Sequence, residues 1–463
     1  EVGRGVAAAL RQEKRSVALI DTDPTAINES QYLDCLLVTG SVLSRDSLLR
    51  AGITDAEMIV MATNNDMVNL LACSFAKKVY SEQVGDRNAS GLKAIAKIRN
   101  PNMEDPVRGA GPLSSWSRAD HIVCASDEIV EQLAAGLLAP SIDEILPLGD
   151  SSWIAATEVT PSSALIGTKT GEVGDIFRGM PSIYAISPDG ESGRLSNGNE
   201  VIQPGDTLVF VSNSTDQFAQ VTRGVGKSDP DLKERAQIAV FGASQFGMRL
   251  ASYYLTRGHN VVVIEPDLDA ANELVGSTVG NSKRLDVIHG DPQDEELLKE
   301  LGIDTHDIAV AALGDDNLNI AISMRAKDKG VQRTGLVLKD RALVEAVQRI
   351  GSINPVSRRQ VTVTSILKSI HMNVPGTFQV IPTVPEVISI SAEVRPEHSF
   401  AGKEIPKIES KLGVRVAMVD RVDEHGATQI IDPISIQTIE AGDRIYLLLL
   451  KKDLKKLEKN LGS

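Results

Sequence analysis

Short apolar runs alternate with stretches of helical period along most of the chain. In the second half the apolar runs end near Ala243, Glu265, Asp291, Leu313 and Asp340, and segments such as MRLASYYLTRG and DEELLKELG separate them. Continuous apolar runs of this length are typical of strands that are buried on both faces of a parallel sheet, and their alternation with helices indicates βαβ units. Because such crossovers are right-handed, the pattern predicts a doubly wound α/β sheet.

The same order of elements occurs twice. Gly40, Gly52, Asp66 and Asn69 each recur 250 residues later, as Gly290, Gly302, Asp316 and Asn319. ALIGTKTGEV resembles FAGKEIPKIE further along, and QPGDTLVFV resembles EAGDRIYLL, so the organisation is A-B-A′-B′. We predict Rossmann-like domains at 1–147 and 235–377, small α+β subdomains at 148–226 and 378–463, and a polar linker at 224–236.

Length and charge narrow the class of protein. A chain of 463 residues is too long for one hydrophobic core, so we expect several domains. The formal net charge is -14, whereas a nucleic-acid binder needs a cluster of basic residues on its surface. The lysines from Lys451 to Lys459 are better explained as the solvated face of a C-terminal helix. Three scattered cysteines suggest core packing in a reducing cytosol rather than a metal site. No apolar stretch approaches the 18 residues that a membrane span needs.

A glycine turn in the second half is the first candidate site. Gly242, Ser244, Gln245, Phe246 and Gly247 follow one apolar run and open a helix, which is the context of a phosphate-binding turn. Glu265 ends the next run, where an acid can accept hydrogen bonds from ribose hydroxyls and repel a 2′-phosphate, which favours NAD(H) or adenine nucleotides. Ser244 replaces the usual glycine and would either bond to a phosphate or push it away. The alternative is a structural turn that binds nothing.

The first half carries part of the same pattern. Glu1, Val2 and Gly3 precede a helix, and Gly3 aligns with Gly247 while Asp21 aligns with Glu265, both at an offset of 244. We therefore expect the first strand and the first two glycines of this half to be missing ahead of Glu1. With them restored, we expect the first half to bind a dinucleotide more tightly than the second.

Polar side chains follow the later strands of each half. Thr63 and Asn64 come after one apolar run, and Lys97 and Arg99 end the next, with Gly314, Asp315 and Lys339 as the second-half equivalents. A cation beside a helix N-terminus suits a phosphate, although a surface salt bridge explains Lys97 or Arg99 equally well.

The repeated Asp-Asn pairs have a simpler explanation. Asp66 and Asp316 are expected to cap the helices that they begin, and Asn69 and Asn319 are expected to serve packing. The sequence contains no HExxH, GxSxG or Walker A lysine loop, and its histidines do not cluster. We therefore predict that the chain is not an enzyme.

The motifs together resemble the TrkA family, the cytosolic subunits of bacterial Trk potassium uptake, in which each half is an RCK/KTN module. The runs VALIDTD, AGITDAEMIVMATNNDMVNLLA, AIAKIRNP, HGDPQDEELL and DIAVAALGDDNLNI carry the resemblance, which covers essentially the whole chain. It implies site residues in the first half at Glu1, Val2, Gly3, Asp21, Thr63, Asn64 and Lys97. Lys97 stands where the family usually has arginine, and Thr39-Gly40-Ser41 departs from the usual Gly-His or Gly-Asp. In the second half Asp291 belongs to a Gly-Asp pair and is assigned to the site.

The resemblance also implies ligands and partners. NADH, NAD, ATP and ADP would bind the Rossmann-like domains of a homotetramer, which would form a ring beneath a membrane channel subunit on the cytoplasmic face of the inner membrane. Two rival functions stay open: regulation of another potassium transporter, such as a glutathione-gated efflux system, and an NAD-dependent oxidoreductase.

Overall fold

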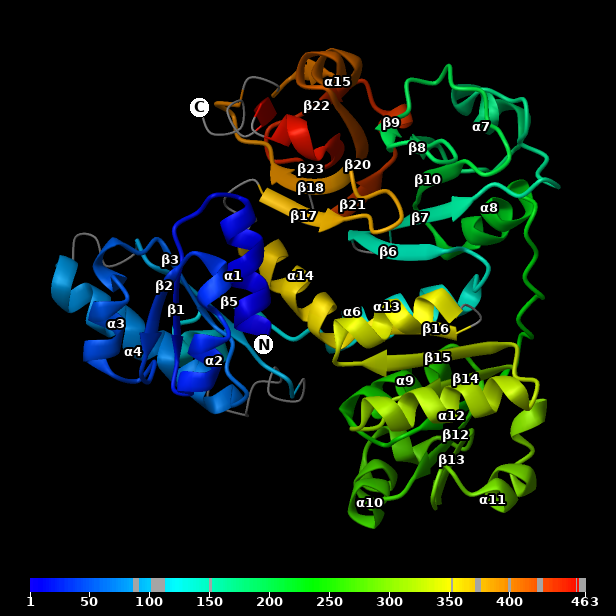
Figure 1. Cartoon of the computed structure of the whole chain (residues 1–463), viewed down its shortest axis with the longest axis horizontal. Coiled ribbons are helices and arrows are strands. Elements are labelled where there is room, and N and C mark those ends of the chain that lie inside the picture. Colours follow the sequence, from blue (N-terminus) through cyan, green and yellow to red (C-terminus); the bar gives the residue numbers. More distant parts are fainter. Residues whose placement is uncertain are drawn as a thin grey trace. The chain divides into compact units, whose positions relative to one another are not determined.

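The computed structural model describes residues 1–85, 91–100, 113–149, 152–350, 353–370, 376–398, 401–422, 428–454 and 456–457. These residues form two compact units. The first contains Glu1–Ser126 together with helix α14 (Arg358–Ile370), and the second contains the remainder. Figure 1 labels the helices and strands of both units.

The Rossmann-like sheet of the second unit has the predicted doubly wound topology. Its six strands are all parallel and lie in the order β13-β12-β11-β14-β15-β16. Numbered along the chain this order is 3-2-1-4-5-6, in which the crevice for a ligand opens where β11 separates β12 from β14. The strands are β11 (Gln237–Phe241), β12 (Asn260–Glu265), β13 (Leu285–His289), β14 (Ile308–Ala311), β15 (Arg333–Leu338) and β16 (Ile353–Ser357). The helices are α9 (Gln245–Thr256), α10 (Leu268–Gly276), α11 (Glu295–Glu300), α12 (Asp316–Asp328) and α13 (Arg341–Ile350).

The first unit repeats this arrangement in two groups of parallel strands. Strand β1 pairs with β2, and β3, β4 and β5 form a separate ladder. By the sequence offsets, β1 corresponds to β12 and β3 to β14, and no strand of the described residues takes the position of β11. The strands are β1 (Ala18–Asp21), β2 (Leu36–Thr39), β3 (Met58–Met61), β4 (Lys93–Lys97) and β5 (His121–Val123). The helices are α1 (Val2–Gln12), α2 (Pro24–Asn28), α3 (Arg45–Arg50), α4 (Asp66–Val84) and α5 (Leu113–Ser117).

The helix that follows the last strand of each sheet packs on the other half of the chain. Helix α14 follows β16, yet its Val363, Ile366 and Leu367 pack with Val6 and Ile95 of the first unit. A Cβ atom on Gly5 would lie 2.7 Å from Val363, so the small residue lets α1 and α14 approach closely.

Helix α6 (Ser126–Leu138) makes the reciprocal contact. It follows β5 but lies in the second unit, where a Cβ on Gly335 would be 2.9 Å from Leu133. Asn354 of β16 donates a hydrogen bond to the Leu133 carbonyl at 3.3 Å. The domain boundaries at residues 147 and 377 stay predictions. Helix α6 precedes the first boundary and α14 precedes the second, yet each helix packs with the other half of the chain.

Two small antiparallel sheets follow the Rossmann-like parts, as the turn-rich B segments predict. The first has the order β6-β7-β10-β8-β9 and the second β17-β18-β23-β20-β21. Apolar residues of both sheets form one core, which includes Ile154 and Val209 from the first and Met418 and Leu448 from the second. The segment with the first sheet contains β6 (Glu144–Gly149), β7 (Ser152–Glu158), α7 (Val173–Ile176), β8 (Ile183–Ser187), β9 (Arg194–Leu195), β10 (Thr207–Ser212) and α8 (Phe218–Gly224). The segment with the second sheet contains β17 (Gly376–Val380), β18 (Val387–Glu393), β19 (Lys403–Glu404), α15 (Ile405–Leu412), β20 (Val414–Val422), β21 (Thr428–Ile431), β22 (Thr438–Ile439) and β23 (Arg444–Leu450). In this segment β19 and β22 pair with each other as a separate two-stranded sheet.

The segment predicted as a linker is held in place by side chains. Asp229 accepts hydrogen bonds from the Ser141 amide at 3.1 Å and the Ser141 hydroxyl at 2.7 Å. Arg333 of β15 donates to the Pro230 carbonyl, and Lys233 pairs with Asp307 at 2.8 Å. The linker is therefore a packed part of the second unit.

One carboxyl group is buried between the two small sheets. Glu144 is 8% exposed and accepts hydrogen bonds from the amide of Thr383 at 3.0 Å and from its hydroxyl at 2.9 Å. Burial raises the pKa of Glu144 from 4.5 to about 7, and the Thr383 hydrogen bonds offset this only in part.

We predict that Glu144→Gln removes a pH dependence of stability. Because the pKa of the folded state lies above that of the unfolded chain, stability is fully present below about pH 4.5 and is lost as the pH rises through 7, by about 3 kcal/mol. The Gln variant should therefore unfold at a higher temperature than the parent at pH 8 and at a similar temperature at pH 5. The exposed Glu158→Gln serves as control, and equal pH profiles for parent and Glu144→Gln would refute the assignment.

Candidate functional site

The glycine turn between β11 and α9 requires glycine at both ends. Gly242 has φ +109°, and a Cβ there would lie 3.0 Å from the Ala312 backbone. A Cβ on Gly247 would lie 1.8 Å from the Gly242 carbonyl oxygen. These glycines allow the turn to close, and Gln245 and Phe246 then form the first turn of α9 with its N-terminus directed to the crevice.

Ser244 caps the helix that the glycine turn opens. Its hydroxyl donates to the Ala312 carbonyl at 2.8 Å and accepts from the Gly247 amide at 3.5 Å, so it caps α9 and ties the turn to the end of β14. The sequence did not indicate these two bonds. That the hydroxyl either binds a phosphate or pushes it away stays a prediction.

The two acids predicted to bind a ribose end equivalent strands but differ in exposure. Glu265 is 6% exposed, and its carboxylate accepts hydrogen bonds from the amides of Ala243 and, at 2.8 Å, Asp267. Asp21 accepts from the Asp23 amide at 3.0 Å in the same way and is only half-buried. The sequence did not indicate that Glu265 holds the glycine turn. A carboxylate has further lone pairs, so a ribose hydroxyl would add to these bonds.

A turn after the third strand is built alike in both halves. The Asp291 carboxylate accepts from the Gln293 amide at 2.8 Å, and the Ser41 hydroxyl accepts from the Leu43 amide at 3.1 Å. Asp291 is exposed at the strand end. The second half therefore has a negative charge where the first has a hydroxyl.

A buried asparagine organises the loop after the fourth strand. Asn69 is fully buried; its amide nitrogen donates to the carbonyls of Thr63 at 3.1 Å and Lys97 at 2.8 Å, and its oxygen accepts from the Thr63 amide. Asn319 makes the corresponding bonds to Leu313 and Val337. The predicted structural role of these asparagines is confirmed.

The predicted capping role of Asp66 and Asp316 is wrong. The N-caps of α4 and α12 are Asn65 and Asp315, each one residue earlier. Asp66 instead accepts from the amides of Arg99 and Asn100 at 2.9 and 3.0 Å, and Asp316 accepts equivalently from the residues after β15. Each Asp thus joins two adjacent strand ends, a role that spacing along the chain does not reveal.

Arg99 and Lys339 are the cations that contact the loops after β3 and β14. Arg99 donates to the Asn64 carbonyl, and Lys339 donates to the Gly314 carbonyl. These bonds place Arg99, and not Lys97, in register with Lys339. Lys97 is buried and donates to the Thr63 carbonyl at 3.0 Å, and burial lowers its pKa.

The remaining first-half candidates lie at the start of α1. The helix begins at Val2 with Glu1 as its N-cap, and the Glu1 side chain makes no capping hydrogen bond. Open space surrounds the position that a Cβ on Gly3 would take, in contrast to Gly247. The structure therefore places the predicted residues of the second half, and Asp21, Thr63, Asn64, Lys97 and Arg99 of the first, at or just after the carboxyl ends of parallel strands. Ligands bind at this edge in doubly wound sheets.

The chain is thus built from tandem Rossmann-like units with polar side chains at the carboxyl ends of their parallel strands. The model of the TrkA-N domain family matches residues 1–125 and 238–358, more than half of the chain, and the chain belongs to this family. Within the described residues, no helix combines the length and apolarity needed to cross a bilayer.

Known relatives match the chain over nearly its full length. The chain is 25% identical to the Trk system potassium uptake protein TrkA of Azorhizobium caulinodans over 99% of this chain and 96% of the relative. It is 24% identical to TrkA of Halomonas elongata over 98% and 94%. The crystal structure of the GsuK RCK domain superposes with a TM-score of 0.54 and 16% identity, covering all of this chain and 93% of that one. The GsuK channel bound to NAD gives 0.53 and 17%, covering 77% of that chain. These likenesses show that the fold is that of RCK domains.

Proposed function

We propose that the chain is a nucleotide-sensing regulatory subunit of a Trk-type potassium uptake system. The observation that carries the proposal is a repeated arrangement of charges at the strand ends. An acid ends β1 in the first half and β12 in the second, and a cation donates to the loop that follows β3 or β14. An acid at that strand end suits the ribose of NAD(H), ATP or ADP, and a helix N-terminus with a nearby cation suits their phosphates. The TrkA relatives support potassium uptake as the process that is regulated.

The proposed site comprises the residues at the two crevices. In the first half they are Glu1, Val2, Gly3, Asp21, Thr63, Asn64, Lys97 and Arg99. In the second half they are Gly242, Ser244, Gln245, Phe246, Gly247, Glu265, Asp291, Gly314 and Lys339. Asp21 and Glu265 have the most specific roles, because a carboxylate accepts bonds from ribose hydroxyls but repels a 2′-phosphate.

The partner in this proposal is a membrane potassium channel subunit. The regulatory subunit acts on the cytoplasmic face of the inner membrane, without spanning it, and senses nucleotides as a homotetrameric ring. Regulation of a different potassium transporter uses the same crevices and is the second candidate, whereas an oxidoreductase would need a substrate domain with an acid–base residue.

Binding without turnover tests the regulatory function. NADH should bind to the chain, but incubation with NADH and common keto acids should leave the near-ultraviolet absorbance of reduced nicotinamide unchanged, because the crevices offer no acid–base pair for hydride transfer. Sustained oxidation faster than roughly 1 per second would identify an enzyme instead. Failure to bind NADH, ATP or ADP would reject nucleotide sensing.

Ser244 is expected to weaken nucleotide binding in the second half. Ser244→Gly should raise affinity for NADH about tenfold, because the phosphate then gains the Gly247 amide and loses a steric obstacle, while glycine at an N-cap costs the helix little. Titration calorimetry with NADH on the parent and on Ser244→Gly measures this change in affinity. Adding Glu265→Ala to the variant should remove the affected site. Ser44→Gly changes the same kind of N-cap at α3 and should leave affinity unaltered. Equal affinities with Ser and Gly at 244 would contradict the proposal.

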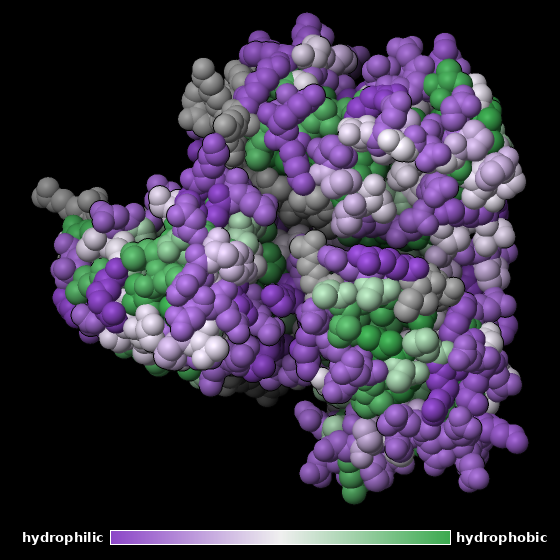
Figure 2. Space-filling model, viewed as in Figure 1, coloured by the Kyte–Doolittle hydropathy of each residue, from purple (hydrophilic) through white to green (hydrophobic). Residues whose placement is uncertain are grey.

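Assembly is the third test. Large apolar side chains are exposed in both units, with Met67 and Leu71 on α4 and Leu268 and Val275 on α10 each more than half exposed. Figure 2 shows apolar side chains on the visible face within an otherwise mainly hydrophilic surface. Light scattering should give about four times the monomer mass of 49.6 kDa, since ring interfaces bury over about 1,000 Å². A monomer at micromolar concentration would exclude the ring.

A further inference from the structure

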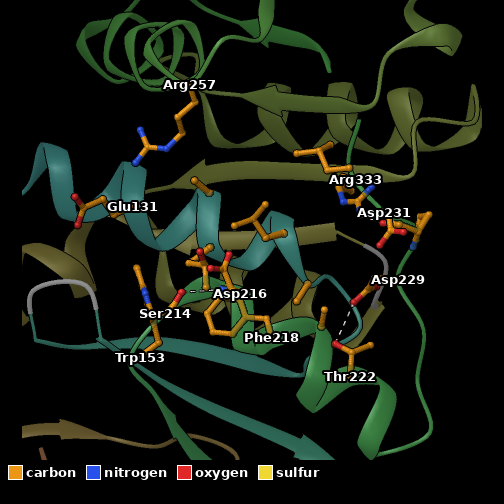
Figure 3. A pocket seen from close by; sticks show the side chains of 18 of the residues that line it. Glu131, Trp153, Ser214, Asp216, Phe218, Thr222, Asp229, Asp231, Arg257 and Arg333 are labelled. Atoms are coloured by element: carbon orange, nitrogen blue, oxygen red, sulfur yellow. Dashed lines mark hydrogen bonds between the residues drawn. The ribbon is translucent and has the colours of Figure 1, made fainter. Parts of the chain in front are cut away.

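A cavity of about 680 Å³ lies in the second unit, away from the glycine turn. Its walls come from α6, β7, the segment between β10 and α8, the linker, the end of α9 and the start of β15 (Figure 3). The volume is within the range of small-molecule sites. It is lined by segments from both halves of the chain, so an occupant would contact the crossover helix α6, the linker and the second Rossmann-like sheet together.

Two buried hydrogen-bond donors in the cavity lining lack acceptors, and half-buried His259 lies in the same lining. The Tyr254 hydroxyl and the Arg333 Nε are buried, and neither has a partner among the described residues, although the Arg333 Nη2 donates to Pro230. His259 accepts from the Ala236 amide through Nδ1, so in the neutral ring Nε2 carries the hydrogen. Burial lowers the pKa of His259, which favours this neutral ring. Buried donors without acceptors indicate a missing group.

A carboxylate is the acceptor that fits these donors best. It has lone pairs for several donors at once, and its planar geometry matches a guanidinium. Three carboxylates lie near Arg333, those of Asp229, Asp307 and Asp231, and they offset in part the lowering of its pKa by burial. Each has another partner: Asp229 accepts from Ser141 and Thr222, Asp307 pairs with Lys233 at 2.8 Å, and Asp231 pairs with Arg223 at 3.9 Å. None of the three accepts a hydrogen bond from the Arg333 Nε.

The exposed side chains of the lining favour a cation. Asp216 and Glu131 are exposed, and Trp153 in the same lining meets the Phe218 ring edge to face at 6.4 Å (Figure 3). Arg257 lies over the Tyr253 ring at 3.5 Å. The lining carries four carboxylates, Glu131, Asp216, Asp229 and Asp231, and three guanidiniums, Arg223, Arg257 and Arg333, an excess of one negative charge. Carboxylates beside an aromatic ring favour a cation.

We propose that this cavity is an effector site, distinct from the nucleotide crevices, for an amino-acid-sized molecule with one carboxylate and a cationic nitrogen several bonds away, the chemistry of a basic amino acid. The carboxylate lies toward Tyr254, His259 and Arg333, and the cation lies toward Asp216 and Glu131. An occupant holds α6, the linker and α9 together and so ties the first half of the chain to the second.

The fluorescence of Trp153 tests the proposal in the full chain. The sequence has two tryptophans, so Trp116→Phe leaves Trp153 as the only one. Titration with L-arginine and L-lysine should give a saturable change for at least one of them. Agmatine lacks the carboxylate and citrulline lacks the charged guanidinium, and both should bind at least about tenfold more weakly than L-arginine. No saturable change by about 10 mM would overturn the site. Agmatine or citrulline that binds as well as arginine would overturn the assigned chemistry.

Two variants locate the ligand within the cavity. Tyr254→Phe removes only an unpaired hydroxyl, so it should weaken ligand binding about tenfold while the unfolding temperature stays equal or rises. Tyr32→Phe, at an exposed tyrosine of the first unit, is its control. Asp216→Asn should weaken binding similarly, with the exposed Asp189→Asn as control. NADH affinity should be the same in all four. Ligand affinity unaffected by both Tyr254→Phe and Asp216→Asn would refute the proposed orientation.

Discussion

A buried asparagine amide holds together the carboxyl end of each parallel sheet. Asn69 and Asn319 have no access to solvent, and each joins the loop after one strand to the last carbonyl groups of the next. Because a buried amide must satisfy its donors and acceptor, the loop has one favourable conformation. That conformation aligns Asn64 with Arg99 in one half and Gly314 with Lys339 in the other, so the polar crevice depends on it.

The exchange of α6 and α14 is the second feature on which the architecture rests. A parallel sheet needs helices on both faces, and here the helix after the last strand of each sheet covers part of the other half. Small residues at the contacts, Gly5, Gly136 and Gly335, allow the close approach.

The two halves are similar in plan and different in detail. In the second half, Ser244 and Glu265 both hold the glycine turn through hydrogen bonds. In the first half, the Asp21 carboxylate accepts a hydrogen bond from the Asp23 amide. Asp291 adds a charge where Ser41 has a hydroxyl. The two repeats therefore keep one backbone plan and differ in the side chains at their strand ends.

The sequence by itself determined the alternation of strands and helices, the twofold repeat and the strand ends at which the polar residues gather. These follow from local periodicity and from constant offsets, which need no knowledge of long-range contacts. The tertiary structure alone decided that Asn65 and Asp315 cap the helices while Asp66 and Asp316 bridge strands, and that the Ser244 hydroxyl turns to Ala312. It also decided that α6 and α14 change partners and that Tyr254, Arg333 and Asp216 share a cavity. Those outcomes depend on contacts between atoms that are more than a hundred residues apart in the sequence, or that meet within a turn. The pattern of residues along the chain contains no information on the distances between such atoms.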